Sequence, residues 1–499
     1  MNLKDVIEGT GAKVLGGVDA EITGIAYDSR NVASEAEGGV IFAAVPGTHS
    51  DGHSYIKSAV TNGAAAVLAE RATEGIDVPQ VIVKDVRAAL SKVSDNFWGR
   101  PSELVKVVGV TGTNGKTTTT YLLESVLREA GEVPGVIGTV NYRYCGAVYP
   151  APHTTPQSPD LQRVLKEMAE KGVTSCVMEV SSHALEQKRV EDCRFACGVF
   201  TNLTLDHLDY HGTMEEYFRC KTHLFTLVTK NNGKSVINRD DPWGERLVKE
   251  FPGALTYGLK AGDIRPESYK LKDGGIEAVV KTPIGEITVS SHLVGEYNLY
   301  NILASVGASV ALGVDRKAIE DGIAALTRVP GRLEKVEAGG IKSFRAYVDY
   351  AHTGDALERA LVALKAVATG RIITVFGCGG NRDRSKRPVM GEIAARLSDI
   401  TIVTSDNPRD EDPLEIIKEV EAGIKGIRKA APEGPLAGKC YAVIPDRAEA
   451  IRKAVATARA GDTVLVAGKG HEDYQIVKGK KHHFDDLEEV RSSIEECQA

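Results

Sequence analysis

The sequence predicts an α/β fold divided into three domains, and three observations support this expectation. Apolar runs of strand length alternate with amphipathic helical stretches along almost the whole chain, which is the pattern of sheets layered with helices. Several of these runs are apolar throughout, as in parallel strands that are covered by helices on both faces. With 499 residues, the chain is also far longer than a single hydrophobic core can fill.

The strand-like and helical stretches fall into three blocks. Residues 1–100 contain short strands, including GVIFAAV at 39–45, and an alanine-rich helix that is expected to end near GAAAVLAE. Residues 101–332 open with the apolar strand LVKVVGVTG, a glycine turn and the helix TTTTYLLESVLREAG. Residues 333–499 hold four strand-like runs, RIITVFG, DITIVTS, KCYAVIP and DTVLVAG, with helices such as AEAIRKAVATARA between them. Each block is therefore expected to form one domain.

Composition and charge restrict the class of protein. A hydrophobic content of 42% and a charged content of 26% are ordinary globular values, and a net charge of -7 argues against a nucleic-acid binder. The start MNLKDVIEG has no apolar run behind it, and no stretch has membrane-spanning length, so neither a secretory signal nor membrane insertion is expected. Among the cysteines only Cys193 and Cys197 lie close together, which favours reduced thiols and a cytoplasmic location.

The segment GVTGTNGKTTTT at 109–120 predicts a phosphate-binding loop. An apolar strand ends at Gly112 and a helix begins near Lys116, so backbone N–H groups and the positive helix end converge on one point. The usual spacing places a glycine five positions before Gly115, but position 110 is valine, so the loop is a shortened variant. Lys116 is expected on the outer phosphates of a nucleotide and Thr117 on Mg²⁺; the expected nucleotide contacts are Gly112, Thr113, Asn114, Gly115, Lys116, Thr117 and Thr118.

A phosphate loop alone leaves a GTPase switch, a kinase, a transporter motor and a ligase open. A second apolar run, VTSCVMEVSSHAL at 173–185, carries Glu179 at its end, and a carboxylate at the carboxyl end of a parallel strand is a candidate Mg²⁺ ligand. His207 and His211 have the spacing of a helical zinc pair, but Leu208 stands where a zinc hydrolase needs glutamate. The phosphate loop does not distinguish these four classes of protein, so the distinction depends on the other residues around the γ-phosphate.

These motifs in this order resemble the Mur ligases, the ATP-dependent amide-forming enzymes of bacterial cell-wall precursor synthesis. The resemblance covers essentially the whole chain and includes GTNGKTTT, MEVSSHAL, TNLTLDHLDYHG, EYNLYNILAS, VPGRLEKV, VDYAHTGDAL, GCGGNRDRSKRP and AGKGHEDYQ. Folylpolyglutamate synthetases share the fold, but typically have glycine and serine where this chain has Thr117 and Thr118. Within the family, the motifs are most similar to those of ligases that extend UDP-N-acetylmuramoyl-L-alanyl-D-glutamate by the third residue of the peptide stem.

The resemblance implies an N-terminal domain for the UDP-sugar, a central parallel-sheet P-loop ATPase domain, and a C-terminal Rossmann-like domain for the incoming amino acid. The expected boundaries are those of the three blocks, 1–100, 101–332 and 333–499. In the third block, GCGGNR has Arg382 where a dinucleotide fingerprint needs its third glycine, so no NAD site is expected. Gly354 is another departure, because relatives usually have proline there, and a looser loop is expected.

The resemblance also implies roles for individual residues. In ATP binding, Asn301 would reach the adenine, Arg332 the phosphates or ribose, and Asp349 the ribose. The UDP-sugar dipeptide would contact Ser29, Thr154, Thr155, Ser181, Gln187 and Arg189. Lys221 matches a lysine that the family carbamylates with CO₂, and the carbamate would join Thr117, Glu179 and His207 around Mg²⁺. The expected catalytic residues are thus Lys116, Glu179, His207 and Lys221.

The implied reaction activates an acid and then joins it to an amine. The γ-carboxylate of the D-glutamyl residue attacks the γ-phosphate of ATP, and an amine then displaces phosphate from the acyl phosphate. The loop TSDNPRD at 404–410 matches the motif of diaminopimelate-adding ligases, in which Arg409 would bind the distal carboxylate as a planar fork. The expected contacts to meso-diaminopimelate are Arg382, Asp406, Asn407, Pro408, Arg409, Gly468 and Glu472.

Several alternatives stay open at this point. One is the ligase that adds L-lysine, although lysine lacks the carboxylate that Arg409 would bind. Another is a different amide ligase of the superfamily, such as a cyanophycin-type or polyglutamate ligase. A nucleotide-gated switch, from a different class, would hydrolyse ATP without requiring a UDP-sugar or an amine. The expected cofactors are ATP and Mg²⁺, and the expected state is a cytoplasmic monomer without nucleic-acid or membrane partners.

Overall fold

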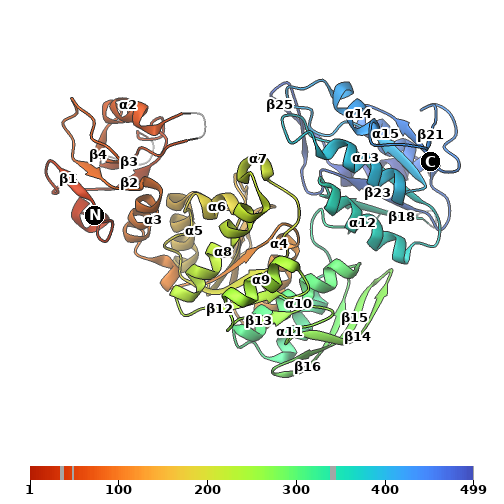
Figure 1. The fold of residues 1–499 in the computed structure, drawn as a ribbon, viewed down its shortest axis with the longest axis horizontal. Coiled ribbons are helices and arrows are strands. Elements are labelled where there is room, and N and C mark those ends of the chain that lie inside the picture. The colour runs from red at the N-terminus through yellow and green to blue at the C-terminus, as the bar shows by residue number, and fades with distance from the viewer. Residues whose placement is uncertain (34–38, 48–49, 338–343, 498–499) are drawn as a thin grey trace.

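The computed structural model describes residues 1–33, 39–47, 50–337 and 344–497. Figure 1 shows three groups of helices and strands in chain order, with the N-terminal and C-terminal groups at opposite ends. Each group has its own sheet of mostly parallel strands. The predicted α/β fold of three domains is confirmed, whereas the boundaries near 100 and 332 stay predictions. Within the described ranges, no helix is both long and apolar enough to cross a membrane.

The N-terminal group is built around a five-stranded sheet with the order β1-β5-β4-β3-β2. Strands β2 to β5 are parallel, and β1 is antiparallel to β5. The elements are β1 (Lys13–Leu15), β2 (Gly24–Ala26), β3 (Val40–Ala43), β4 (Ala64–Ala69), β5 (Gln80–Ile82), α1 (Leu3–Val6), α2 (Ile56–Thr61) and α3 (Val86–Phe97), with 3-10 turns at Gly52–Tyr55 and Pro101–Glu103. Figure 1 shows α3 between this sheet and the central group.

The alanine-rich segment of this group is a strand, so the predicted helix is wrong. Helix α2 ends at Thr61, and Gly63 turns the chain with a φ of 99° before β4 begins at Ala64. Alanine favours helices in isolation, but Ala66 and its neighbours in β4 are buried and pair with β3 and β5. Burial and pairing in the sheet override a weak local preference.

The central group contains an eight-stranded sheet with the order β13-β12-β11-β6-β10-β7-β8-β9. The strands from β13 to β7 are parallel, and β8 and β9 form an antiparallel edge. The strands are β6 (Lys106–Thr111), β7 (Pro134–Ile137), β8 (Tyr142–Tyr144), β9 (Ala147–Tyr149), β10 (Ser175–Glu179), β11 (Phe195–Phe200), β12 (Lys234–Asn238) and β13 (Leu255–Tyr257). The parallel strands and their helices agree with the sequence prediction.

Eight helices and a small second sheet complete the central group as the structure describes it. The helices are α4 (Lys116–Glu129), α5 (Ser158–Glu170), α6 (Ser182–Glu186), α7 (Leu208–His211), α8 (Met214–Lys230), α9 (Pro242–Glu250), α10 (Glu296–Ala311) and α11 (Arg316–Ala325). The second sheet is antiparallel, with strands β14 (Arg265–Lys272), β15 (Gly275–Thr282) and β16 (Gly285–Ser291). This second sheet was not predicted from the sequence.

The strand order of the central sheet brings the expected catalytic segments to one edge. Strand β6 lies between β10 and β11; Glu179 at the end of β10 pairs with Val110, and Phe200 at the end of β11 pairs with Thr111. Successive side chains of β6, Val107 and Val108, belong to two different hydrophobic clusters, so both faces of the sheet are covered. The carboxyl ends of such parallel strands form the crevice in which ligands bind.

The C-terminal group has a seven-stranded sheet with the order β17-β18-β23-β19-β20-β22-β21, parallel except for β17. Its strands are β17 (Glu334–Lys335), β18 (Arg345–Asp349), β19 (Ile372–Phe376), β20 (Ile400–Val403), β21 (Arg428–Lys429), β22 (Cys440–Val443) and β23 (Thr463–Ala467), followed by the hairpin β24 (Tyr474–Val477) and β25 (Lys480–His483). The helices are α12 (Gly354–Val367), α13 (Lys386–Leu397), α14 (Pro413–Glu421), α15 (Arg447–Thr457) and α16 (Asp486–Glu496). All four predicted strands of this block are present.

Candidate active site

The phosphate loop connects the end of β6 to the start of α4. Gly112 and Gly115 have φ angles of 143° and 90°, in the region that favours glycine. Asn202, shortly after β11, accepts two hydrogen bonds from the loop. Thr113 N donates to its backbone carbonyl (2.9 Å), and Asn114 N donates to its side-chain oxygen (3.0 Å). Helix α4 begins at the next residue after Gly115, so its free N-terminal amides face the loop, as anion binding requires.

Replacing Gly115 by alanine is expected to disrupt this loop. A Cβ atom on Gly115 would lie 2.3 Å from Oδ1 of Asn301, and the φ of 90° is unfavourable for an L side chain. Backbone strain and overpacking each cost about 1–3 kcal/mol. Scanning calorimetry should therefore show a lower Tm for Gly115→Ala, and titration calorimetry should show weaker binding of ATP.

Gly131 supplies the matched control, because it follows the C-terminal end of the same helix. Its φ is 78°, but a Cβ atom there would have no neighbour within 4 Å. Gly131→Ala should lower the Tm by a smaller amount and leave the affinity for ATP unchanged. An ATP affinity of Gly115→Ala equal to that of the wild type would contradict the tight packing of the loop around the nucleotide.

Two lysines, Lys116, which is half-buried, and Lys221, which is buried, donate to the same carbonyl oxygen of the phosphate loop. Nζ of Lys116 lies 2.8 Å from O of Gly112, and Nζ of Lys221, on α8, lies 2.9 Å from it. Burial lowers the pKa of Lys116; burial and then the charge of Lys116 hold the pKa of Lys221 well below its usual range. Among the described residues, the Lys221 ammonium has no carboxylate partner and lies 4.6 Å from the ring centre of Tyr217.

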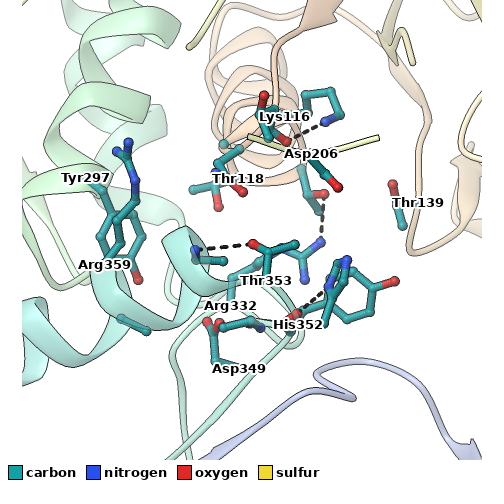
Figure 2. A pocket seen from close by; sticks show the side chains of 18 of the residues that line it. Lys116, Thr118, Thr139, Asp206, Tyr297, Arg332, Asp349, His352, Thr353 and Arg359 are labelled. Atoms are coloured by element: carbon teal, nitrogen blue, oxygen red, sulfur yellow. Dashed lines mark hydrogen bonds between the residues drawn. The ribbon is translucent and has the colours of Figure 1, made fainter. Parts of the chain in front are cut away.

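The loop faces a cavity of about 280 Å³ between the central and C-terminal groups. Across it, Nη2 of Arg332 donates to Oγ1 of Thr117 (3.1 Å), and the guanidinium lies over the ring of Tyr350 at 4.6 Å. Figure 2 shows Arg332 between the phosphate loop and the strand end that carries Asp349. The expected nucleotide residues that line the cavity are Thr113, Asn114, Gly115, Lys116, Thr117, Thr118, Asn301, Arg332 and Asp349.

Hydrogen bonds fix two of these nucleotide residues in place. Nδ2 of Asn301 donates to Oδ1 of Asn298 (3.0 Å). The carboxylate of Asp349 accepts from the backbone N–H groups of Leu333 (2.6 Å) and Ala351 (2.8 Å), and burial raises its pKa. Asp349 therefore fixes the segment that joins the central group to the C-terminal group. This role was not expected from the sequence, which predicts only a contact to the ribose.

A second cavity of about 340 Å³ adjoins the first. The two cavities share Asn114, Gly115, Tyr297, Asn301 and Arg359. The rings of Tyr297 and Tyr300 contribute to the wall of the second cavity. Flat aromatic walls with a nearby amide suit a planar heterocycle.

The carboxylate and hydroxyl oxygens beside the loop fit a magnesium ion that takes further ligands from a nucleotide. The two carboxylate oxygens of Glu179 accept from N and Oγ1 of Thr139, both at 2.9 Å. Nε2 of His207 lies 3.5 Å from Oδ2 of Asp206, and burial lowers the pKa of the His207 imidazole to about 4. No three His, Cys, Asp or Glu side chains of the described residues are placed to hold a metal alone. Mg²⁺ usually binds one or two carboxylates together with phosphates and water, so Glu179 and Thr117 suit it.

Four residues expected to bind the UDP-sugar dipeptide form one hydrogen-bond network. Oγ1 of Thr155 donates to the backbone carbonyl of Glu179 (2.8 Å), and Nη1 of Arg189 donates to the carbonyl of Thr155 (2.8 Å). Ser181 N donates to Oγ1 of Thr155 (3.1 Å), and Nη2 of Arg189 donates to Oε1 of Gln187 (2.7 Å). Thr155 and the segment from Ser181 to Arg189 are therefore linked at the carboxyl end of β10.

The other two expected dipeptide residues lie outside this network. The hydroxyl of Thr154 lies 3.0 Å from that of Thr139 at the first cavity. Ser29 belongs to the N-terminal group, where its carbonyl accepts a hydrogen bond from Asn62 (2.9 Å). The N-terminal group is tied to the central group by an ion pair, because Nζ of Lys188 donates to the carboxylate of Asp85 (2.6 Å).

Six of the seven residues expected to bind diaminopimelate lie on the loops after β20 and β23, and Arg382 lies on the loop after β19. Gly468, with a φ of 122°, follows β23. Nδ2 of Asn407 donates to Oε2 of Glu472 (2.9 Å), and the buried ammonium of Lys469 pairs with the carboxylate of Asp406 (3.3 Å). Burial, reinforced by the negative charge of Asp406, raises the pKa of Glu472. The two loops are therefore joined by polar contacts between their side chains.

The two arginines of the predicted set flank the same glycine. A Cβ atom on Gly379 would lie 2.8 Å from Nη1 of Arg409 and 3.9 Å from Cγ of Arg382. Arg409, with a φ of 54°, donates from Nη1 to the carbonyl of Gly380 (2.8 Å). Arg382 is exposed, and its guanidinium has no hydrogen-bond or ion-pair partner among the residues that the structure describes. Two arginine side chains that flank the same glycine, one of them with an unpaired guanidinium among the described residues, suit a carboxylate ligand.

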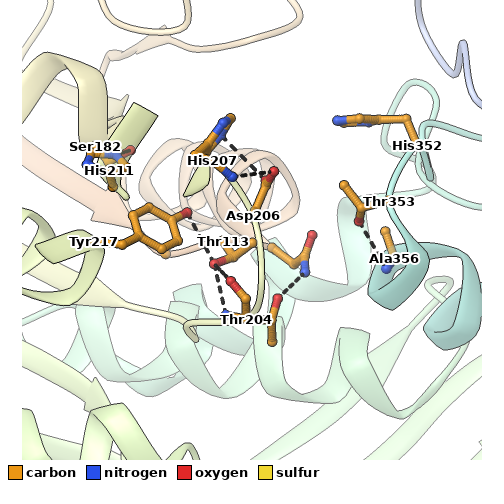
Figure 3. Close-up of polar contacts among 12 residues, drawn as sticks. Thr113, Ser182, Thr204, Asp206, His207, His211, Tyr217, His352, Thr353 and Ala356 are labelled. Carbon is orange, nitrogen blue, oxygen red and sulfur yellow. Dashed lines mark hydrogen bonds and ion pairs between the residues drawn. The ribbon is translucent and has the colours of Figure 1, made fainter. Parts of the chain in front are cut away.

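The helix that follows the DYAHTGDAL motif starts in a regular way in spite of Gly354. Helix α12 begins at Gly354, and Oγ1 of Thr353 accepts a hydrogen bond from N of Ala356 (3.3 Å), as Figure 3 shows. A threonine cap thus provides the start signal that proline at the first helical position would otherwise provide.

Several residues at the cavity were not predicted from the sequence. Asp206 lies beside His207, as Figure 3 shows, and lines the cavity. Oδ2 of Asp355 accepts a hydrogen bond from Nδ2 of Asn114 (2.7 Å) and pairs with Arg359. The motifs TNLTLDHLDYHG and VDYAHTGDAL contain Asp206 and Asp355, so both could have been proposed. Arg359 lies outside every quoted motif, and nothing in the sequence pattern points to it.

Comparisons with known proteins agree with this arrangement. The Mur ligase family, catalytic domain, matches residues 21–98; the Mur ligase middle domain matches residues 110–309; and the Mur ligase, glutamate ligase domain, matches residues 331–470. The chain is 50% identical to the UDP-N-acetylmuramoyl-L-alanyl-D-glutamate--2,6-diaminopimelate ligase of Geobacter metallireducens over 99% of each chain. It is 49% identical to the Geobacter sulfurreducens protein of the same name over 96% of this chain and 95% of that protein.

Solved structures are similar over the whole length as well. The structure of a UDP-N-acetylmuramoyl-L-alanyl-D-glutamate--2,6-diaminopimelate ligase is 32% identical in sequence, with a TM-score of 0.71 over 100% of this chain and 99% of that chain. A MurF structure from Acinetobacter baumannii, 19% identical, has a TM-score of 0.67 over 99% of this chain and 98% of that chain and shows the shared fold. Because the domain matches and the full-length relatives agree, the chain belongs to the Mur ligase family.

Proposed function

We propose that this protein is an ATP-dependent amide ligase that adds meso-diaminopimelate to the γ-carboxylate of the D-glutamyl residue in UDP-N-acetylmuramoyl-L-alanyl-D-glutamate. The product is a precursor of peptidoglycan. The names of relatives at 50% and 49% identity support this reaction. The proposal places the protein in the cytoplasm, where ATP is available, and one chain carries every expected residue, so a monomer suffices.

The observation that carries the proposal is a series of two side-chain contacts and short chain steps that leads from the first cavity to Arg409. Tyr350 lines the cavity, and its ring centre lies 5.0 Å from that of His471. Glu472 follows directly and accepts the hydrogen bond from Asn407, two residues before Arg409. An amino acid held at Arg409 would therefore lie along a wall that ends at the phosphates.

The two adjoining cavities support a defined orientation of ATP. Its phosphates would lie on the loop at Lys116, opposite the guanidinium of Arg332. Its adenine would lie near Asn301, against the aromatic wall of the second cavity, and its ribose near Asp349. Thr117 and Glu179 would hold Mg²⁺, together with His207; the ion would neutralise phosphate charge.

The first chemical step transfers a phosphoryl group. A γ-carboxylate oxygen attacks the γ-phosphorus, the bond to the β,γ-bridging oxygen breaks, and ADP leaves. Two anions must approach each other, so positioning and charge neutralisation carry most of the catalysis. Lys116 and Arg332 are two cations of this chain that line the cavity. The network around Thr155 and Arg189 would hold the carboxylate in place.

The second step forms the amide. The neutral amine of the amino acid attacks the carbonyl carbon of the acyl phosphate, phosphate leaves from the tetrahedral intermediate, and the amine nitrogen loses a proton. Diaminopimelate and lysine differ by the carboxylate at the distal end. Arg409 and Arg382 would bind that carboxylate, and Glu472 with the carbonyl of Gly468 would accept from the distal ammonium group.

Lys221 is expected to react with CO₂, because its amine is buried beside a cation and has no carboxylate partner among the described residues. The ammonium first loses a proton; the neutral amine then attacks the carbon of CO₂ and the nitrogen releases a second proton, so that a buried cation becomes an anion beside Lys116. In ¹³C NMR with labelled bicarbonate, the wild type should give a carbamate resonance that Lys221→Gln lacks. An identical resonance in both proteins would contradict the assignment.

The proposed function is tested by phosphate release from ATP in the presence of UDP-N-acetylmuramoyl-L-alanyl-D-glutamate and one candidate amine at a time. Release should depend on both the UDP-sugar and meso-diaminopimelate, and mass spectrometry should show the tripeptide product. A preference for L-lysine would instead indicate the lysine-adding ligase. Release that needs neither substrate would indicate a nucleotide-gated switch, and either result would overturn the proposal.

A further inference from the structure

Arg387, at the start of α13, is a fully buried arginine that contacts two loops of the expected amino-acid site. We call residues 377–385 the arginine-382 loop and residues 404–411 the arginine-409 loop. The Arg387 side chain is 0% exposed. Its Nη2 donates to the carbonyl of Gly379 in the first loop (3.2 Å) and to Oε1 of Glu411 in the second (2.9 Å). Its Nη1 donates to Oε2 of Glu411 (2.9 Å) and to Oε2 of Glu419 on α14 (2.8 Å).

The two loops are in direct contact through their backbones. Gly380 N donates to the carbonyl of Asn407 (2.9 Å), and Asp410 N donates to Oδ1 of Asn381 (3.1 Å). A Cβ atom on Gly380 would lie 2.0 Å from the carbonyl oxygen of Pro408. The backbones therefore touch, and a shift of one loop changes the place of the other.

Glu411 completes the connection between the loops. Its carboxylate accepts from both terminal nitrogens of Arg387 and from the backbone N–H of Asn381 in the arginine-382 loop. The hydrogen bonds from Arg387 lower the pKa of Glu411 to about 2, so the ion pair persists at neutral pH. One guanidinium thus ties a carbonyl of the first loop to a carboxylate of the second.

We propose that Arg387 is a positioning residue that sets the spacing of Arg382 and Arg409, and thereby the preference for an amino acid with a second carboxylate. The inference rests on the proposed function. Arg387 reaches the substrate only through the loops, whereas Arg382 and Arg409 would contact it. Binding by two guanidinium groups depends on their separation, and displacements of about 1 Å are enough to lose it. Lysine, which lacks the carboxylate, should be insensitive to this spacing.

The test compares Arg387→Lys with the wild type in steady-state kinetics on meso-diaminopimelate and L-lysine. Lysine at position 387 keeps the charge but replaces the planar fork by a point charge that cannot bridge two loops. We expect the ratio of kcat/KM for diaminopimelate to kcat/KM for L-lysine to fall at least ~10-fold, mainly through the KM for diaminopimelate. The KM values for ATP and the UDP-sugar should stay within about 2-fold of the wild type, because Arg387 contacts neither site.

Arg371→Lys is the matched control. Arg371 pairs with Asp462 in the same domain (Nη2 to Oδ2, 2.6 Å), but both residues precede their strands, β19 and β23, and therefore lie at the opposite edge of the sheet. Both exchanges weaken an arginine–carboxylate pair, so a general loss of stability should lower both Tm values. Only Arg387→Lys should change the ratio of the two substrates.

Hydrogen exchange provides a readout that needs no substrate. In Arg387→Lys, the amides of Gly380 and Asp410, which bond across the loops, should exchange faster than in Arg371→Lys. If Arg387→Lys does not fold, Glu411→Gln, which removes the charge in the arginine-409 loop, should show the same two effects. Unchanged substrate ratio and unchanged loop exchange in the folded variant would overturn the inference. A wild type that does not prefer diaminopimelate would overturn the proposed function, and with it the selectivity role, even where loop exchange responds.

Discussion

Lys116→Ala is expected to lower the rate of ADP formation by on the order of 10³-fold, the size of effect seen when a cation or donor is removed from a phosphoryl-transfer or oxyanion site. The Lys116 ammonium donates to the loop carbonyls of Gly112 and Thr113 and lines the cavity where two anions would meet. Without it, the charge that develops on the transferred phosphoryl group lacks one of the cations that line the cavity. The coupled release of ADP, followed with both substrates saturating, measures the effect.

The control for Lys116→Ala is Lys234→Ala. Lys234 is exposed at the start of β12, at the sheet edge opposite the loop, and its loss should leave the rate unchanged. Circular dichroism and the Tm should show that Lys116→Ala still folds, because removing a buried charge relieves a desolvation cost. Near-normal ADP formation by folded Lys116→Ala would refute the role of this lysine in phosphoryl transfer.

Arg409→Met should abolish the discrimination between meso-diaminopimelate and L-lysine. With diaminopimelate the variant leaves a carboxylate without its guanidinium, and a lost partner of this kind costs on the order of 2–5 kcal/mol, a factor of tens to thousands. With L-lysine no carboxylate is lost, and the wild type already leaves Arg409 without one, so kcat/KM should change little. Competition between the two amino acids, analysed by mass spectrometry of the tripeptide products, measures the ratio directly.

Arg396→Met is the matched control for Arg409→Met. Arg396 is also in the C-terminal domain, but it forms surface ion pairs with Glu358 and Glu392, which contribute little to stability. The product ratio should be the same for Arg396→Met and the wild type. An Arg409→Met protein that still selects diaminopimelate would show that another residue reads the distal carboxylate.

Much of the fold could be predicted because its signals are local. The phosphate loop is read from a few adjacent residues, and the strands of the C-terminal sheet from short apolar runs. The alanine-rich β4 was mistaken for a helix, because its side chains alone favour a helix and only pairing with β3 and β5 makes it a strand. The antiparallel sheet of β14 to β16 was missed for a similar reason: one face is exposed and its polar residues resemble a loop.

The residues of the candidate site can also be divided into those that the sequence predicts and those that only the structure reveals. Residues in quoted motifs, such as Glu179 and Asn407, were proposed from sequence, and the structure shows what they contact. Arg359 was not proposed as a site residue because it lies outside every quoted motif, and Arg387 was not proposed because only folding brings its partners Glu411 and Glu419 near. The hydrogen bond between Asn114 and Asp355 joins positions 241 residues apart, and no periodicity or spacing encodes such a pair.

The amino-acid sequence alone determined the α/β class, the division into three domains, the phosphate loop and the identity of the polar residues expected to do the chemistry. Each of these features depends on the composition of short segments, which can be interpreted without knowing how the chain folds. The tertiary structure decided which side chains line the cavities. It also brought Lys116 and Lys221 to one carbonyl oxygen and placed the buried Arg387 between two loops. Those relations depend on burial and on distances between remote segments, and both arise only when the sheets and helices pack.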